Sequence, residues 1–551
     1  MGFATFVHVG VLAARSCCPH PRRRGETPVP KTVREATVEQ LRSFGMTSIF
    51  GNPGSTELPM FRDFPDDFRY VLGLQESVVL AMADGYAQAS NGAALVNLHS
   101  AAGVGHAMGN IFTAYRNRTP LVITAGQQAR SLMVGEPFLF ADRATELPLP
   151  YVKWSCEPAR AQDVPAALAR AYRTAMAAPR GPVFLSIPVD DWDQPLDPDQ
   201  PLPAGGVRAD VRGDPAALGE VAAALAGCER PALVVGAGVD RDGAFHDVVA
   251  LAERHQASVW AAPVSARCGF PETHPLFAGF LPASRDGVRE RLTGHDVVVV
   301  IGAPVFTYHV EGHGPHLPPG TALFQLVDDP ATAAWTPLGT AVITGVRMGV
   351  RDLLAGPEPV HREAPPARVR PERVHHTESI SEALLMQTLA ELRPASSIVV
   401  EEAPSSRSAM QDHLPFDHPE SFFTTASGGL GHGMPAAVGV ALARPERRVI
   451  ALLGDGSSMY AIQALWSAAR EAAPVTFVVV NNGGYVALDR FAQHFGVDKP
   501  VGTALPGIDF AGLARDVGCA GRTVRHPDEL TASLRDALAS AEPYLVDVHV
   551  T

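Results

Sequence analysis

The stretch between residues 449 and 484 constrains the fold of this chain more than any other. An apolar run at 449–453 ends in an acidic turn, an amphipathic helix is expected next, and a second apolar run at 475–480 ends at two asparagines. A strand–helix–strand unit crosses over right-handed, so both strands can run parallel in one sheet. The carboxyl ends of neighbouring strands then lie about 5 Å apart. We therefore expect Asp455 and Asn482 to face one crevice, at the edge where open α/β sheets bind ligands.

The residues at these strand ends predict a site for a metal ion and a diphosphate. Asp455 offers a carboxylate and Asn482 an amide oxygen, and hard oxygen ligands suit Mg²⁺, which commonly bridges to phosphates. Gly454 and Gly456 flank the aspartate and would let the backbone approach a diphosphate closely. An Asp-containing turn can also be structural, but the spacing of GDG, helix and NNGGY favours a ligand site.

Similar apolar, β-branched runs recur along the chain and alternate with alanine-rich amphipathic segments. Near-continuous apolar runs are typical of strands in a parallel sheet that is covered on both faces. The alternation predicts the α/β class, with doubly wound parallel sheets. The runs stand at 120–128, 181–191, 231–240, 295–305, 474–484 and 543–550.

Two proline-rich stretches interrupt this pattern, at 190–206 and 356–371, and we interpret them as extended linkers. They divide the chain into three α/β units, expected at 31–190, 207–355 and 376–551. Residues 1–30 are expected to form a disordered extension. The middle unit has glycine turns after two strands, but neither completes a dinucleotide-binding motif, so we expect it to be structural.

Composition excludes several classes of function. The chain has 551 residues, 46% of them hydrophobic, and a net charge of −13. No basic stripe is present beyond Arg22–Arg24, so nucleic acid is not an expected partner. No apolar run reaches the ~18 residues of a membrane span. The six cysteines form no CxxC pair, so we expect reduced thiols and a cytoplasmic protein.

The GDG and NN elements resemble the motif of thiamine-diphosphate-dependent enzymes. Further segments narrow the resemblance to the benzoylformate decarboxylases, and it runs from about residue 33 to the end. It implies a pyrimidine-binding domain, a central Rossmann-like domain and a diphosphate-binding domain. The segments include FGNPGSTELPMF (50–61), GLQESVVLAMADGYAQAS (73–90), NLHSAAGVGHAMG (97–109), VWAAPVSARCGFPETHPLF (259–277) and SGGLGHGMPAAVG (427–439).

The resemblance implies non-oxidative decarboxylation of an aromatic 2-oxo acid, converting benzoylformate to benzaldehyde and CO₂ through a thiamine-diphosphate ylide. That cofactor needs one buried acid, whose pKa desolvation would raise. Glu76 fits, because it follows an apolar run and begins a predicted helix. The family match assigns the substrate carboxylate to Ser55 and proton transfer to two pocket histidines, His99 and His274.

The same match assigns the remaining site residues. The divalent ion, Mg²⁺ or Ca²⁺, would be held by Asp455, Asn482 and the carbonyl of Gly484. The acyl pocket would be lined by Ala487, Leu488 and Phe491. Cofactor contacts would come from Ser405, Gly428, Leu430, Gly454, Gly456, Ser457 and Tyr485, with Leu430 wedged under the thiazolium ring.

Some residues depart from the family pattern. Pro404 stands where the family has a threonine, His432 replaces a large apolar residue, and Asp489–Arg490 replace Arg-Trp. These changes leave another aryl or a branched aliphatic 2-oxo acid open as the substrate.

Two alternative functions are weaker. An acetolactate-synthase-like carboligase usually has SGPGATN where this chain has LHSAAGVGHA with His99. A non-catalytic relative would be expected to lose Glu76, Asp455 or Asn482, and this chain keeps all three.

The resemblance also implies a partner. In that family the cofactor lies between the first unit of one subunit and the third unit of another. Glu76 and Asp455 fall in these two units, so we expect at least a dimer, and by family analogy a dimer of dimers. The other expected partner is the small-molecule 2-oxo acid.

Overall fold

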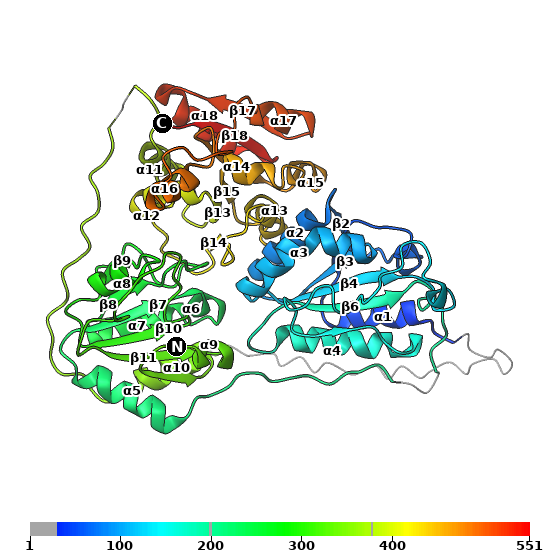
Figure 1. Cartoon of the computed structure of the whole chain (residues 1–551), viewed down its shortest axis with the longest axis horizontal. Coiled ribbons are helices and arrows are strands. Elements are labelled where there is room, and N and C mark those ends of the chain that lie inside the picture. Colours follow the sequence, from blue (N-terminus) through cyan, green and yellow to red (C-terminus); the bar gives the residue numbers. More distant parts are fainter. Residues whose placement is uncertain (1–29, 198–200, 376–377) are drawn as a thin grey trace, which may run out of the picture.

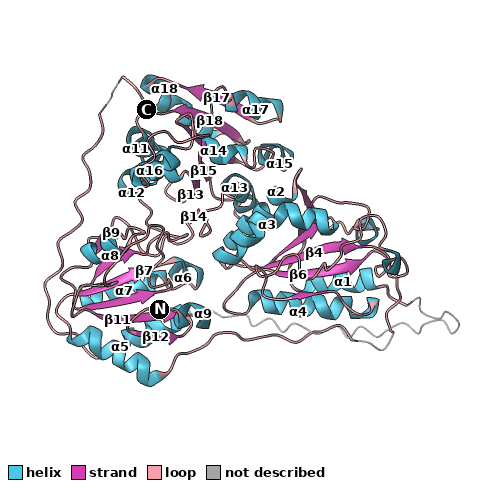
Figure 2. Ribbon diagram, viewed as in Figure 1, coloured by secondary structure: helices cyan, strands magenta, loops and turns pink. Residues whose placement is uncertain are grey.

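The computed structural model describes residues 30–197, 201–375 and 378–551 (Figure 1). The extension expected at residues 1–30 lies outside this part except for its last residue. The described chain contains three six-stranded sheets in which all neighbouring strands are parallel, with helices on both faces (Figure 2). The predicted doubly wound α/β class is confirmed. No helix in the described ranges is long and apolar enough to cross a membrane.

The N-terminal sheet has the strand order β2-β1-β3-β4-β6-β5. Its strands are β1 (Ser48–Gly51), β2 (Arg69–Leu72), β3 (Ala94–Leu98), β4 (Leu121–Gln127), β5 (Ser155–Cys156) and β6 (Val183–Pro188). Its helices are α1 (Val33–Ser43), α2 (Glu76–Ser90), α3 (Ser100–Asn117) and α4 (Val164–Met176).

The central sheet has the order β12-β11-β10-β7-β8-β9. Its strands are β7 (Pro231–Val235), β8 (Ser258–Ala261), β9 (Phe277–Phe280), β10 (Val297–Ile301), β11 (Ala322–Val327) and β12 (Thr340–Ile343). Its helices are α5 (Pro215–Gly227), α6 (Ala237–Arg241), α7 (Phe245–His255), α8 (Arg285–Arg291), α9 (Pro330–Ala334) and α10 (Val346–Leu354). The glycine turns after β7 and β10 pack on each other, because the N–H of Gly238 donates to the carbonyl of Gly302 at 2.9 Å.

The C-terminal sheet has the order β14-β13-β15-β16-β18-β17. Its strands are β13 (Ile398–Glu402), β14 (Phe422–Thr424), β15 (Val449–Gly454), β16 (Val475–Asn481), β17 (Ala520–Val524) and β18 (Tyr544–His549). Its helices are α11 (Glu382–Leu392), α12 (Arg407–His413), α13 (Gly433–Ala443), α14 (Asp455–Met459), α15 (Ala464–Arg470), α16 (Val486–His494), α17 (Phe510–Asp516) and α18 (Pro527–Ala539).

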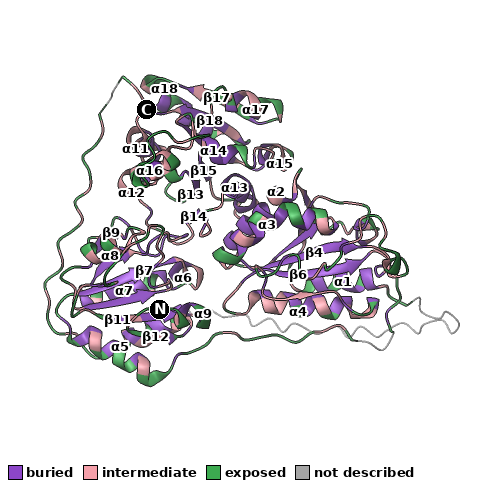
Figure 3. Ribbon diagram, viewed as in Figure 1, coloured by how far each residue is buried: buried purple, intermediate pink, exposed green. Residues whose placement is uncertain are grey.

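The central strands form the interior of each domain, as their near-continuous apolar sequence predicts. Every residue of β4, β10 and β16 is buried. The strands inside the three domains are drawn largely in the colour of buried residues (Figure 3). The helix expected between β15 and β16 is divided into α14 and α15. This break lets Leu465 of α15 join the hydrophobic core while Asp455 stays at the end of β15.

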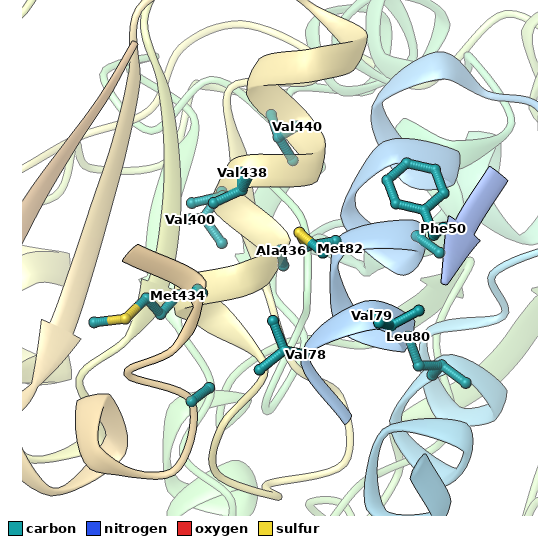
Figure 4. Close-up of a cluster of buried hydrophobic side chains, with 14 of the residues drawn as sticks. Phe50, Val78, Val79, Leu80, Met82, Val400, Met434, Ala436, Val438 and Val440 are labelled. Atoms are coloured by element: carbon teal, nitrogen blue, oxygen red, sulfur yellow. The ribbon is translucent and has the colours of Figure 1, made fainter. Parts of the chain in front are cut away.

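The N-terminal and C-terminal domains share one core where α2 packs against α13 (Figure 4). Glycines allow the two backbones to approach. A Cβ built on Gly439 would lie 1.9 Å from the carbonyl oxygen of Met82, and one on Gly85 would lie 2.1 Å from that of Ala436. A larger residue at either glycine would force the helices apart.

The second linker follows the outside of the central domain before it reaches α11 (Figure 1). Arg362 fastens it there by donating to the carbonyls of Leu225, Ala226, Cys228 and His255. These carbonyls lie at the ends of α5 and α7, where helices leave acceptors unsatisfied. The stretch lacks regular structure, yet it is held in place.

Candidate active site

Asp455 and Asn482 follow two neighbouring strands, β15 and β16, which pair in parallel with Gly454 opposite Val480. The Asp455 carboxylate is buried and accepts hydrogen bonds from the backbone N–H groups of Gly456 (2.6 Å) and Gly484 (2.9 Å). Burial raises the pKa of Asp455 above its usual value, against the opposing effect of these donors. The predicted juxtaposition of the strand ends is therefore present.

The donors at these strand ends fit a divalent cation that is shared with a ligand. In the described ranges no lysine or arginine forms an ion pair with Asp455, so its charge has no cationic side-chain partner. The same ranges contain no group of three or more His, Cys, Asp or Glu side chains that could hold a metal. One carboxylate, the Asn482 amide and a backbone carbonyl suit a Mg²⁺ ion whose other ligands are phosphate oxygens and water.

Two positions beside these residues favour glycine, each for a different reason. A Cβ built on Gly456 would lie 2.3 Å from the Tyr485 ring, so only glycine fits under this tyrosine. Gly428 has a φ of 74°, a conformation that favours glycine, and nothing lies within 4 Å of a Cβ built there. Its carbonyl and the side chain of Leu430 belong to the turn before α13.

Glu402 holds this turn and was not predicted. Its buried carboxylate accepts hydrogen bonds from the N–H groups of Gly431 (2.6 Å), His432 (2.8 Å) and Gly433. Burial raises the pKa of Glu402 to about 7 although these donors oppose the shift. The turn that carries Leu430 is thus fixed by three bonds to one side chain.

A cavity of about 1230 Å³ joins these elements between the C-terminal and central domains. It is lined by loops after β8, β9 and β10 and by the carboxyl ends of β13, β15 and β16. All the cofactor, metal and acyl-pocket residues expected from the sequence line it. They are Ser405, Gly428, Leu430, Gly454, Asp455, Gly456, Ser457, Asn482, Gly484, Tyr485, Ala487, Leu488 and Phe491.

The histidine that the central domain contributes to the cavity is His309, not His274. The His309 ring lies 4.6 Å from that of Phe491, centroid to centroid. His274 does not line the cavity. It accepts from the N–H of Leu276 at 3.2 Å, and its other ring nitrogen lies 3.3 Å from Glu253. The hydrogen bond from Leu276 holds the His274 ring in the turn before β9, whereas His309 follows the carboxyl end of β10.

Ser55 and His99 lie together in the N-terminal domain around a buried glutamate, Glu57, that sequence reasoning missed. Glu57 accepts from the N–H groups of Gly54 and Gly126, both at 2.9 Å, and lies 2.8 Å from Nδ1 of His99. A Cβ built on Gly54 would lie 1.9 Å from the His99 ring, so the glycine lets the turn with exposed Ser55 reach the histidine. The glutamate orients the imidazole.

Glu76 lies next to this group as the first residue of α2. A Cβ built on Gly103 would lie 3.3 Å from Oε1 of Glu76 and 3.5 Å from Cβ of His99, so both side chains flank one glycine of α3. The other oxygen of Glu76 is 3.0 Å from Nδ1 of His106. Ser55, Glu76 and His99 do not line the cavity described above. Within one chain, the predicted site is therefore divided into two halves.

Comparison with known protein families finds a match in each of the three domains. Three family models match, described as thiamine pyrophosphate enzyme N-terminal TPP binding domain (residues 31–139), central domain (218–353) and C-terminal TPP binding domain (404–548). Thiamine pyrophosphate is another name for thiamine diphosphate.

The chain is also similar to individual proteins over nearly its whole length. A benzoylformate decarboxylase of Pseudomonas aeruginosa is 44% identical, over 94% of this chain and 98% of that protein. Among solved structures, the Rhodococcus jostii RHA1 thiamine diphosphate-dependent 4-hydroxybenzoylformate decarboxylase has a TM-score of 0.92 and 42% identity, covering 95% of this chain and 99% of that one. Benzoylformate decarboxylase from Polynucleobacter necessarius has a TM-score of 0.93 and 39% identity, with 95% and 99% covered. The chain belongs to the thiamine pyrophosphate enzymes, and within them to the benzoylformate decarboxylase family.

Proposed function

We propose that this enzyme decarboxylates an aromatic 2-oxo acid without oxidation, converting benzoylformate and a proton to benzaldehyde and CO₂. The observation that carries the proposal is that one cavity is lined both by Asp455 and Asn482 and by Leu488, Phe491 and His309. An oxygen-lined strand edge suits a metal-bound diphosphate, and an apolar wall suits an aryl group. The names of the similar decarboxylases support the same substrate class.

Thiamine diphosphate, when bound, supplies the carbon nucleophile and the electron sink that the loss of CO₂ requires. Asp455, Asn482 and the carbonyl of Gly484 would hold Mg²⁺ or Ca²⁺ against the diphosphate. The hydroxyl groups of Ser405 and Ser457 would contact the diphosphate oxygens, with Gly454, Gly456 and Tyr485 beside them. Leu430 would support the thiazolium ring from below, and the carbonyl of Gly428 would accept a hydrogen bond from the aminopyrimidine.

The chain's own acids and bases would move the protons. Glu76 would donate a hydrogen bond to the pyrimidine ring. Ser55 donates a hydrogen bond to the substrate carboxylate. His99, oriented by Glu57, and His309, packed on Phe491, hold and deliver protons to the substrate oxygen and carbon.

In the proposed assembly, Ser55, Glu76 and His99 come from one subunit, and the residues that line the cavity come from another. Ser55, Glu76 and His99 do not line the cavity of their own chain, so the cavity lacks the acid that the family match assigns to the cofactor. The buried acids Glu402 and Glu272 do line it, but backbone N–H groups already donate to their carboxylates. A second copy would supply the missing acid, which makes the dimer the smallest active unit and a dimer of dimers the expected form. We place the enzyme in the cytoplasm, where free thiols such as those of Cys156, Cys228, Cys268 and Cys519 persist.

The direct experiment measures CO₂ release from a panel of aryl and alkyl 2-oxo acids in the presence of thiamine diphosphate and Mg²⁺. We expect benzoylformate among the good substrates and benzaldehyde as its product. The Glu76→Gln variant should bind the cofactor and lose most of its turnover. Near-wild-type turnover of this variant would remove the acid role from Glu76. Failure of the wild type to bind the cofactor, or acetolactate as the main product from pyruvate, would overturn the proposal.

A further inference from the structure

His106 takes no part in the chemistry described so far, yet it contacts the proposed activating acid. Nδ1 of His106 lies 3.0 Å from Oε2 of Glu76. The His106 side chain is 62% exposed and that of Glu76 only 12%. Within the single chain, an exposed imidazole thus contacts a carboxyl group that is nearly buried.

The backbone holds this contact in place. His99, Gly103 and His106 are spaced by four and three residues along α3, which puts them on one face of the helix. Glu76 fits against Gly103, and His106 covers its outer oxygen. Asn110, one turn further along α3, donates to the carbonyl (2.9 Å) and the hydroxyl (2.8 Å) of Ser77. These two bonds fix the start of α2 against α3.

We infer that His106 is a positioning residue that orients Glu76 and exchanges a proton with it, which deepens the proposed function and rests on it. In this exchange the N–H bond at Nδ1 of the His106 imidazolium breaks and an O–H bond forms at Oε2 of Glu76. The imidazolium becomes neutral imidazole and the carboxylate becomes a neutral carboxyl group. No other reactant is required, and the reverse step restores the ion pair.

The exchange would prepare Glu76 for its task. A carboxyl group that must donate to the cofactor has to carry a proton, although carboxyl groups are ordinarily ionised at neutral pH. His106 is an ionisable side chain in contact with Glu76, and the 3.0 Å separation lets a proton pass directly between Nδ1 and Oε2. In the proposal His106 supplies that proton when the cofactor binds.

Other charged groups near this pair are already engaged. On the side of β1 and α3, Glu57 is bound to His99 and to two backbone N–H groups. Further along α2, Asp84 is paired with His432 of α13. Asn110 and Ser77 are polar but do not titrate. Among the described residues of one chain, Glu76 and His106 thus form a contacting pair that can share a proton.

Calorimetry of cofactor binding tests this inference without relying on turnover. The dimeric apoprotein is titrated with thiamine diphosphate and Mg²⁺ at about pH 7 in buffers of different ionisation enthalpy, which counts the protons taken up from solvent. In the wild type part of the proton comes from His106. In His106→Asn it must all come from the buffer, so we expect proton uptake per site to exceed that of the wild type, by at most about one proton.

Three further variants make the result specific. His106→Gln should behave like His106→Asn. His246→Asn, on the exposed face of α7, should match the wild type. In the Glu76→Gln background, His106→Asn should change nothing, because the proton acceptor is gone. Equal uptake by wild type and His106→Asn, or a difference that persists in Glu76→Gln, would overturn the inference. Absence of any cofactor binding by the wild type would instead remove the proposed function.

Discussion

At the scale of single residues, two histidines of the central domain differ in their position relative to the cavity. His309 lines the cavity on Phe491, whereas His274 lies against Glu253 outside it. We expect His309→Asn to lower kcat/KM for benzoylformate by about 100-fold, the usual contribution of a proton donor. His274→Asn, its matched control, should stay within about twofold of the wild type. Equal losses in the two variants, with cofactor binding intact, would contradict the assignment of His309.

The residues that were predictable from sequence are those whose placement depends on local rules. Asp455 and Asn482 follow strands of one crossover unit, so the parallel pairing of β15 with β16 alone brings them together. His309 comes from a different sheet, and its place depends on how the central domain meets the C-terminal domain. That docking depends on contacts between residues far apart in the sequence. The available sequence signal was that His309 follows β10, at the edge where parallel sheets bind ligands.

Glu57 shows a second reason why some site residues could not be predicted from the sequence. Its acidic side chain lies in a turn sequence and would ordinarily be assigned to the surface, but it is buried by two backbone donors and His99. Nothing in the local pattern marks those partners, since Gly126 is far away in the sequence.

At the scale of elements, the contact of α2 with α13 contains a buried ion pair. Nε2 of His432 lies 2.5 Å from the carboxylate of Asp84, and both side chains are fully buried. Burial opposes the charges, yet the pKa of His432 is raised by Asp84 and that of Asp84 is lowered by His432. The family departure at His432 therefore has a partner, which the sequence alone could not identify.

We expect His432→Phe to lower the free energy of unfolding by about 3 kcal/mol, because it leaves the Asp84 carboxylate buried and unpaired. Urea unfolding followed by circular dichroism measures this. In Asp84→Asn/His432→Phe most of the loss should be recovered, because the remaining amide carries no charge and can still bond Gln88 and Asn117. A double variant less stable than His432→Phe would show that the pair itself is not the cause.

At the scale of the whole molecule, Glu272 joins the central domain to the C-terminal domain. The backbone N–H of Glu272 donates to the carbonyl of Phe416 at 2.9 Å. The Glu272 carboxylate accepts from the N–H of Phe416 at 3.1 Å. Burial raises the pKa of Glu272 from its unfolded value of 4.5 to about 8. Between these values the folded chain keeps a proton that the unfolded chain releases, so stability falls by about 1.4 kcal/mol per pH unit as pH rises. Glu272→Gln should flatten the decline in thermal midpoint between pH 5 and 8 seen in the wild type; parallel curves would refute this origin.

The proposed division of the site between two copies leads to a test of the whole assembly. Glu76→Gln removes the proposed acid from one half, and Asp455→Ala removes the proposed metal ligand from the other, so each variant alone should be inactive. When both are expressed together, half of the dimers are mixed. Each mixed dimer has one site with both defects and one site with neither, provided that every site draws Glu76 from one subunit and Asp455 from its partner. Activity should then return to about a quarter of the wild type. Sites built within single chains would carry one defect in every case, and the mixture would stay as inactive as its components.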